Sequence, residues 1–191
     1  MHFKKKLFIS SLSLLVLSTA SASYLTPVTN IDIVKQQVIH YHNSGAYICD
    51  VATVAHQAQS YLRQRIQENK ALQHPKKLAM VLDIDETSLS NYEDLKQLGF
   101  GGTAKMQDEA EGRADDPAIQ PTLALYKYAI KHDVTVFFIT GRTEQYRRST
   151  LKNLGAVGYA VKGSVNNCEN SAVSKQCLLY LRDGKYSHDS A

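Results

Sequence analysis

The fold class is decided by the stretch Leu78-Ala79-Met80-Val81-Leu82-Asp83-Ile84-Asp85-Glu86-Thr87, in which a continuous apolar run leads directly into a pair of aspartates. A short apolar run that ends at polar residues is typical of a strand buried on both faces, as in a parallel sheet. Residues i and i+2 of an extended chain point to the same side. The sequence therefore predicts that Asp83 and Asp85 project together from the carboxyl end of this strand, while Ile84 packs away from them.

A second apolar run repeats this arrangement further along the chain. Residues 134–139 are largely apolar and lead into Thr140-Gly141-Arg142. The segment from Pro121 to Lys131 is expected to be the crossover helix between the two strands. Strands that alternate with helices in this way indicate an α/β protein with a parallel sheet and flanking helices. Two further elements complete the pattern, a helix from about Glu144 to Leu154 that ends at Gly155 and a third apolar run at residues 178–181.

A pair of amphipathic helices is expected before the first strand. From Asn30 to about Leu72 the apolar residues recur at helical spacing, with a break near Asn43-Ser44-Gly45. Asp50 is the expected N-cap of the second helix, and His74-Pro75 is expected to end it. These two helices are interpreted as packing elements without a chemical role.

The connection between the first strand and the crossover helix is long. It covers about residues 91–120, whereas connections of about 2–6 residues are typical of such units. A long connection at the carboxyl end of a strand usually forms a lid or a binding loop, and a solvated surface loop is the alternative. We expect residues 91–120 to form a small cap insertion.

The composition and the first residues indicate an exported globular protein. The chain has 191 residues, of which 43% are hydrophobic and 21% are charged, and such values exclude disordered, collagen-like and coiled-coil proteins. Three lysines at positions 4–6 precede an apolar run to Leu17 and the small residues Ala20-Ser21-Ala22. This pattern predicts a signal peptide over residues 1–22, cleaved after Ala22. Residues 23–191 would then form one secreted or periplasmic domain.

Cleavage would also change the charge of the chain. The sequence has 22 lysines and arginines and 18 acidic residues, and loss of the three leader lysines leaves a net charge of 19 − 18 = +1. A nearly neutral chain argues against a nucleic-acid polymer as partner. No stable membrane anchor is expected, because the apolar run is too short to span a bilayer. In an oxidising compartment Cys168 and Cys177 can form a disulfide that leaves Cys49 free, although spacing alone does not fix the pairing.

The residues at the two strand ends favour phosphate chemistry. Two adjacent carboxylates repel each other unless a cation lies between them, and this suits a division of labour in which one attacks and the other carries a proton. A hydroxyl at Thr140 followed by the amide of Gly141 can hold phosphate oxygens. The alternative is that Asp83 and Asp85 merely cap a turn and that Thr140-Gly141 is an ordinary loop. Because both motifs end successive apolar strands, we favour the functional interpretation.

Together the two motifs resemble the haloacid dehalogenase (HAD) superfamily. Within it the chain is similar to the subfamily IIIB acid phosphatases, which include plant vegetative storage proteins and secreted bacterial acid phosphatases. The resemblance runs from about Asn30 to Arg182 and implies an HAD-like (Rossmannoid) parallel sheet. Further matching segments are Phe100-Gly101-Gly102, Asp116-Pro117-Ala118-Ile119 and Asn153-Leu154.

The resemblance also implies roles for individual residues. Asp83 would be the nucleophile that forms an aspartyl-phosphate, and Asp85 would be the general acid and then the general base. Thr140 and the Gly141 amide would hold the transferring phosphoryl group of a small phosphomonoester. Mg²⁺ would bind the Asp83 carboxylate and the Asp85 backbone carbonyl. Arg142 would pair either with a carboxylate near the site or with the substrate.

The family pattern includes two further motifs that are not recognised after Leu181. One is a lysine that steadies the nucleophile, and the other is an acidic pair that completes the Mg²⁺ site after a later strand. We therefore expect the strand carrying Asp83 to lack one neighbour and the metal site to lack a ligand. Three interpretations follow: a phosphatase that completes its site in another way, a truncated product, and a non-enzymatic binding or storage protein on the same scaffold.

Overall fold

Three parallel strands form the sheet of the computed structural model, which describes residues 30–161 and 178–182. The strands are β1 (Ala79–Leu82), β2 (Thr135–Thr143) and β3 (Leu179–Arg182), and they lie in the order β1-β2-β3. The α/β class with a parallel sheet, predicted from the apolar runs, is confirmed. β1 forms one edge of this sheet among the described residues.

Helices connect the strands in the predicted order. α5 (Gln120–Lys131) joins β1 to β2, and a 3-10 turn, η1 (Glu144–Tyr146), leads into α6 (Arg147–Ala156) after β2. The prediction that Gly155 ends this helix is wrong, because Gly155 lies inside α6. The left-handed residue after the helix is Gly158, with φ of 104°, a conformation that glycine adopts without a steric penalty.

β2 is longer than the sequence indicated. The predicted strand covered residues 134–139, and Thr140-Gly141-Arg142 were expected to follow it at a strand-to-helix turn. Instead all three residues belong to β2, whose inward-facing positions stay buried as far as Arg142. Polar residues end a strand when they need water, whereas Thr140 and Arg142 have hydrogen-bonding partners inside the protein, described below.

The two N-terminal helices are present as predicted. They are α1 (Ile31–Asn43) and α2 (Ala46–Lys70), separated by Ser44 and Gly45. The prediction of Asp50 as an N-cap is wrong, because α2 begins at Ala46 and its N-cap is Gly45, which has φ of 84°. Asp50 instead accepts a hydrogen bond of 2.6 Å from the Tyr41 hydroxyl and so links the two helices.

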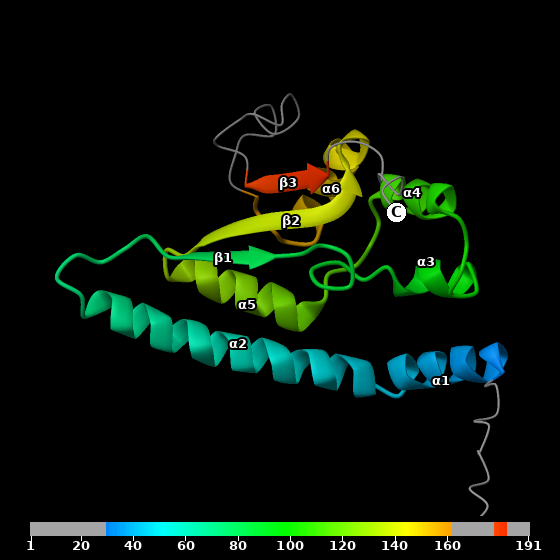
Figure 1. The fold of residues 1–191 in the computed structure, drawn as a ribbon, viewed down its shortest axis with the longest axis horizontal. Helices are drawn as coiled ribbons and strands as arrows, with labels where there is room; N and C mark the ends of the chain where they lie inside the picture. Colours follow the sequence, from blue (N-terminus) through cyan, green and yellow to red (C-terminus); the bar gives the residue numbers. More distant parts are fainter. Residues whose placement is uncertain (1–29, 162–177, 183–191) are drawn as a thin grey trace, which may run out of the picture.

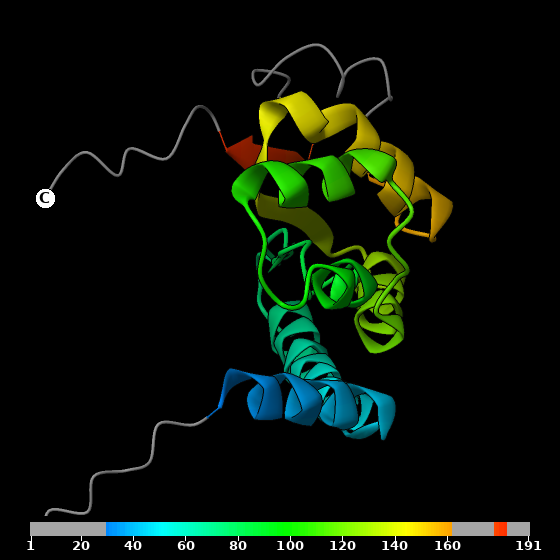
Figure 2. The same ribbon diagram turned by 90° about the vertical axis from the view of Figure 1, so that its right-hand side faces the viewer.

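The hydrophobic core lies on one face of the sheet, between the strands and helices α2 and α5 (Figure 1). Phe138 is fully buried at its centre and its ring lies 5.9 Å from that of Tyr126 on α5. α1 buries none of its residues in the described part of the chain and extends away from the sheet (Figure 2). The core therefore fixes α5 and the strands, which carry the polar motifs, more firmly than it fixes α1.

The opposite face of the sheet is exposed. Val81, Ile139 and Tyr180, one from each strand, have exposed fractions of 58%, 51% and 47%. The expectation that the strands are buried on both faces is therefore wrong for the described residues. α5 and α6 follow successive strands in one direction across the sheet, and right-handed crossovers of this kind place both helices on the same face. The apolar residues of the other face are left to solvent here.

Beyond the carboxyl ends of the strands lie two short helices, α3 (Tyr92–Gln97) and α4 (Ala104–Arg113) (Figure 1). They come from the segment that the sequence analysis expected to form a cap. The proposed leader and the proposed pair Cys168–Cys177 lie outside the described residues, in which Cys49 is a free, exposed thiol. In the described part of the chain no helix combines the length and the apolar character that a membrane span needs.

Candidate functional site

The turn after β1 is built around the backbone of Ile84. Its carbonyl accepts hydrogen bonds from the amides of Ser88 (2.8 Å) and Leu89 (2.9 Å), and its side chain is fully buried. The Ser88 hydroxyl donates to the carbonyl of Asp83 at 2.6 Å. The predicted inward packing of Ile84 thus anchors a tight turn, and this turn presents Asp85 at the edge of the sheet.

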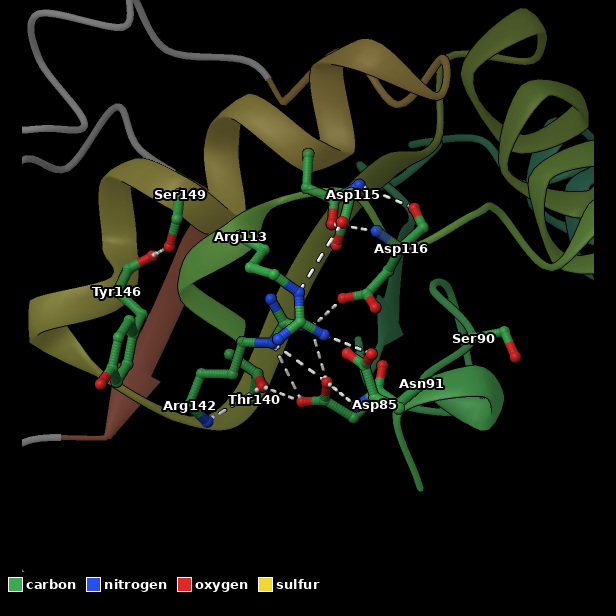
Figure 3. Close-up of polar contacts among 12 residues, drawn as sticks. Asp85, Ser90, Asn91, Arg113, Asp115, Asp116, Thr140, Arg142, Tyr146 and Ser149 are labelled. Carbon is green, nitrogen blue, oxygen red and sulfur yellow. Dashed lines mark hydrogen bonds and ion pairs between the residues drawn. The ribbon is translucent and has the colours of Figure 1, made fainter. Parts of the chain in front are cut away.

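Asp85 is the centre of the polar cluster at this edge (Figure 3). Its Oδ1 accepts from Asn91 Nδ2 at 2.7 Å and from Arg142 Nη2 at 2.7 Å and Nε at 3.0 Å. Its Oδ2 has longer contacts of 3.3 Å with the Thr140 hydroxyl and with Arg142 Nε. Every partner is a donor, so Asp85 acts as an acceptor on both oxygens.

Arg142 is buried between two carboxylates. Its side chain has no exposed surface, and Nη2 donates to Asp85 and, at 3.1 Å, to Asp116 Oδ2. Burial, the largest single influence, acts to lower the pKa of the guanidinium, but hydrogen bonds to Asp85 and Asp116 and the charges of Asp85 and Glu111 raise it overall. Of the two roles left open for Arg142, the structure shows the pairing with carboxylates.

Asp116 is held in place by a reciprocal pair of hydrogen bonds. Asn153 on α6 accepts from the Asp116 amide at 3.1 Å and donates to its carbonyl at 2.7 Å. Burial raises the pKa of the Asp116 carboxyl, while its hydrogen bond to Arg142 lowers it. The segments around Asp116 and Asn153, which lie far apart in the sequence, are therefore joined in one buried network.

A second network ties the same turn to the N-terminal helices. Glu86, which has a φ of 50°, accepts from the Tyr47 hydroxyl of α2 at 2.8 Å and from the backbone amide of Asn91. Burial, together with this bond to Glu86, raises the pKa of Tyr47. Since Asn91 also donates to Asp85, this network links α2 to the central carboxylate.

Asp83 is placed differently from the other predicted site residues. It is exposed, and its Oδ1 accepts a 2.7 Å hydrogen bond from the amide of Ile84. Thr140 is buried, and its hydroxyl donates to Asp85 and accepts from the amide of Arg142 at 3.1 Å. The structure thus brings Asp85, Thr140 and Arg142 together, while no contact of that group with the Asp83 side chain is found in the described residues.

A cavity of about 750 Å³ opens between the strand ends and helices α3 and α4. Asp85, Gly141 and Arg142 are among its lining residues, whereas Asp83 and Thr140 are not. A side chain at Gly141 would meet nothing within 4 Å, so the backbone is open on that side. The remaining walls come from α3, α4 and η1, together with Asn91, Asp116, Thr143 and Arg182.

The cavity is richer in acidic than in basic side chains. Its described lining includes the guanidinium groups of Arg142 and Arg182 and six carboxylates: Asp85, Asp94, Asp108, Glu111, Asp116 and Glu144. Since Asp85 and Asp116 already balance Arg142, an excess of negative charge remains. An anionic ligand would enter such a cavity more readily together with a cation.

Glu111 on α4 shows the effect of this environment most clearly. Burial raises the pKa of its carboxyl to about 7, with smaller contributions from the charges of Asp85, Asp108 and Asp116, while Arg142 acts in the opposite direction. Burial and the charges of Asp108, Glu111 and Glu109 raise the pKa of the nearby Tyr146 hydroxyl. Glu111 therefore gains and loses its proton near neutral pH, well above the ordinary value of 4.5.

We predict that Glu111 makes the stability of the fold depend on pH. Between its ordinary pKa of 4.5 and the folded-state value of about 7, the folded chain keeps a proton that the unfolded chain has released, so stability falls as pH rises through this window. Above it, Glu111→Gln should be more stable than the parent by about 2 kcal/mol, a value reduced for partial solvent exposure. Urea unfolding followed by circular dichroism at several pH values measures this difference.

The matched control is Glu109→Gln, which changes an exposed acid on the same helix. This substitution should change the free energy of unfolding by less than about 0.5 kcal/mol at every pH. Equal pH profiles for the parent and Glu111→Gln would contradict the assignment of the titration to Glu111.

The donor set for a metal ion is small. In residues 30–161 and 178–182 there is no group of three or more histidine, cysteine or acidic residues placed to hold a metal. The Asp85 carboxylate is engaged by donors, which leaves the exposed Asp83 carboxylate and the Asp85 carbonyl as predicted ligands. Mg²⁺ accepts one or two protein oxygens and completes its shell with water and substrate oxygens. The residues present would offer a divalent cation these two oxygens, with water and substrate oxygens completing its shell.

Comparison with known proteins identifies the family. The model of the HAD superfamily, subfamily IIIB (acid phosphatase), matches residues 3–180. The chain belongs to this subfamily. The resemblance predicted from the motifs around Asp83 and Thr140 is thereby confirmed.

Two plant proteins and a solved structure are similar to this chain over different lengths. The stem 28 kDa glycoprotein of Glycine max is 31% identical over 122 residues, which are 62% of this chain and 45% of that protein. Acid phosphatase 1 of Solanum lycopersicum is 32% identical over 84 residues, 41% of this chain and 32% of that protein. The class C acid phosphatase from Bacillus anthracis has the same fold, with a TM-score of 0.58 and 22% identity over 79% of this chain and 59% of that one. The chain thus spans less than half the length of these curated relatives.

Three residues of the site were not assigned a role from the sequence, namely Asn91, Glu111 and Asp116. Asp116 stood within a segment that matched the subfamily, and this was the available signal. Glu111 shares one helix face with Gln107 and Asp108 on α4, and all three line the cavity. This helical spacing was not recognised in the sequence, because residues 91–120 were expected to form a small cap without assigned helices.

Proposed function

We propose that this member of the acid phosphatase subfamily hydrolyses phosphomonoesters through an aspartyl-phosphate. The observation that carries the proposal is the fixed carboxylate of Asp85, which Arg142, Asn91 and Thr140 hold in the wall of a cavity large enough for a phosphate ester. Subfamily membership supplies the reaction class. The mildly acidic working pH and the export of the protein belong to the same proposal.

In the proposed first step the Asp83 carboxylate attacks phosphorus. A bond forms between Asp83 Oδ and phosphorus while the bond from phosphorus to the leaving-group oxygen breaks, and Asp85 gives that oxygen a proton. In the second step water attacks phosphorus, Asp85 takes up the proton of the water, and the bond to Asp83 breaks to release phosphate. A bound Mg²⁺ would neutralise negative charge between the Asp83 carboxylate and the phosphoryl group.

The hydrogen bonds of Asp85 indicate which of its oxygens exchanges the proton. Oδ1 takes the short bonds from Asn91 and Arg142, at 2.7 Å each. Oδ2 has only 3.3 Å contacts among the described residues. The proton therefore moves through Oδ2, and Oδ1 serves to orient the carboxyl group.

A second candidate function is the binding of phosphate esters without turnover. The observation in its favour is that Asp83, the proposed nucleophile, is exposed and does not line the described cavity. A chain that binds a phosphate ester in the cavity, without Asp83 in reach of phosphorus, would be a non-catalytic binding or storage-type protein.

Hydrolysis of an aryl phosphate by the purified chain separates the two candidates. With Mg²⁺ at mildly acidic pH the first predicts release of phosphate, and a chelator should abolish it. Because Mg²⁺ would have few protein ligands here, we expect half of the maximal activity at a Mg²⁺ concentration on the order of 1 mM or above. Release of phosphate that is unaffected by the chelator would contradict the metal assignment. Calorimetric binding of the ester without any turnover would favour the second candidate.

A further inference from the structure

The outer edge of β1 has no partner among the described residues. β1 pairs only with β2 there, in parallel, over Ala79 to Leu82. The amide of Thr135 donates to the carbonyl of Leu78 at 3.0 Å, so this carbonyl points toward β2. Successive residues of a strand direct their N–H and C=O groups to opposite edges, and those of Ala79 and Val81 therefore point away from β2. An open edge of this kind is a template for pairing with another strand.

The side chains along this edge form a pattern that is complementary to itself when the strand direction is reversed. The open face carries Lys77, Ala79, Val81 and Asp83, all exposed, and the face toward the core carries Leu78, Met80, Leu82 and Ile84, which are partly or fully buried. On the open face a cation thus precedes two aliphatic side chains, and an anion follows them. Neither Lys77 nor Asp83 forms an ion pair within the described residues, so both charges are available to a second chain.

Antiparallel pairing of two such edges about a two-fold axis has one register that also pairs the charges. In an antiparallel pair, opposite residues exchange both of their N–H···O=C bonds at every second position. With Met80 opposite the partner's Met80, Ala79 lies opposite the partner's Val81, and both direct their backbone groups outward. The same register sets Lys77 opposite the partner's Asp83, and Asp83 opposite the partner's Lys77. A shift by two residues keeps the backbone bonds but sets Asp83 against an uncharged residue.

We propose that this protein forms a two-fold symmetric dimer in which the β1 edges of two copies pair antiparallel and Lys77 of each copy pairs with the partner's Asp83. The two three-stranded sheets then become one continuous sheet. Opposite residues of an antiparallel pair have Cβ atoms about 4.5–5.5 Å apart, a separation that a lysine and an aspartate bridge readily. On the core face Leu78 lies opposite the partner's Leu82, so apolar side chains also meet across the axis. A second copy thereby supplies a cation next to the residue proposed as the nucleophile.

Sedimentation velocity of the full chain in metal-free buffer tests the dimer, which has twice the mass of the 21.3 kDa chain. Two short strand edges bury less area than a standard interface, so we expect a dissociation constant on the order of 10 μM. Lys77→Glu places like charges opposite each other at two symmetric positions, and it should weaken association by about tenfold or more. The double variant Lys77→Glu, Asp83→Lys restores opposite charges at both positions and should recover most of the affinity.

The matched control is Lys76→Glu, which makes the same change of charge one residue away. Lys76 is also exposed, but in the proposed register it lies opposite the partner's Ile84 and not opposite an acid. Its substitution should change the dissociation constant by no more than about threefold. Circular dichroism checks that every variant keeps the parent fold.

A chain that stays monomeric up to about 300 μM, far above the expected dissociation constant, would overturn the proposal. A dimer that Lys77→Glu leaves unchanged, or that the double variant does not restore, would place the interface elsewhere and overturn the β1 pairing. Sedimentation measures association whether or not the chain hydrolyses esters. A failure of this proposal is therefore a separate result from a failure of the proposed phosphatase function.

Discussion

Replacing Arg142 by methionine is expected to lower the free energy of unfolding by about 3–5 kcal/mol, because removal of one partner from a buried ion pair leaves the other charge uncompensated. The guanidinium has no exposed surface, and it pairs with Asp85 and with Asp116, of which the latter is itself almost fully buried. Two carboxylates that now share one cation would face each other without it. Urea unfolding followed by circular dichroism measures this decrease in the free energy of unfolding. The dependence of that free energy on urea concentration should be the same for both proteins.

Arg113→Met is the matched control for this substitution. Arg113 also pairs with two aspartates, Asp94 and Asp115, but about half of its side chain is exposed. Exposed ion pairs contribute about 0–1 kcal/mol, so the same chemical change should cost far less here. Arg142→Lys keeps the charge but loses the planar guanidinium with its several donors, so its loss of stability should lie between those of Arg142→Met and Arg113→Met. Equal losses for Arg142→Met and Arg113→Met would show that the buried network does not carry stability.

The stability deficit of Arg142→Met, which is the decrease in its free energy of unfolding, should depend on pH. Burial raises the pKa of Asp116 even beside the guanidinium, whose hydrogen bond and charge act to lower it. Without Arg142 this lowering disappears, so the pKa of Asp116 rises further. Protonation then removes a buried charge, and the deficit should be smaller at mildly acidic pH than at alkaline pH.

The same ion pair explains where the sequence predicted the fold well and where it did not. The apolar residues of 78–82 and 134–139 predicted the α/β class and the first two strands of the parallel sheet, because such runs have few ways to be buried. The end of β2 was misplaced because Thr140 and Arg142 look like residues that need water. Their partner Asp85 lies more than fifty positions away in sequence, and a local pattern does not reveal a pairing of that range.

The candidate site was predictable in part for a similar reason. Asp85, Thr140 and Arg142 stand at strand ends, and parallel strands bring such ends to one edge of the sheet. Asn91, Glu111 and Asp116 reach that edge through the helices and loops of the cap segment, whose path the sequence did not define. The sequence also placed Asp83 with Asp85 on one side of an extended strand, but β1 ends at Leu82, and the tight turn that follows separates their surroundings.

Asp83→Asn is expected to reduce the hydrolysis of phosphomonoesters by about 10³-fold or more, the scale of loss when a covalent nucleophile is removed. The amide has the same shape as the carboxylate but does not attack phosphorus. The structure makes this a clean test, because Asp83 is exposed and its Oδ1 accepts one bond, from the Ile84 amide, which an amide oxygen can also accept. The free energy of unfolding should therefore change by less than about 0.5 kcal/mol.

Asp85→Asn should behave differently from Asp83→Asn, and the contrast decides the division of roles. Asp85 balances the buried charge of Arg142, so its replacement removes both a proton carrier and an ion-pair partner. We expect a loss of activity together with a loss of stability, and no stable phosphoryl adduct. In rapid-quench experiments with ³²P-labelled substrate, the parent chain should carry acid-stable label on Asp83 during turnover, and Asp83→Asn should carry none. Full activity of Asp83→Asn, or label on another residue, would remove Asp83 from the mechanism and assign the attack on phosphorus to another group. A parent chain that binds the ester but carries no label and releases no phosphate would instead favour the binding function, because the exposed position of Asp83 outside the cavity would then be its working position.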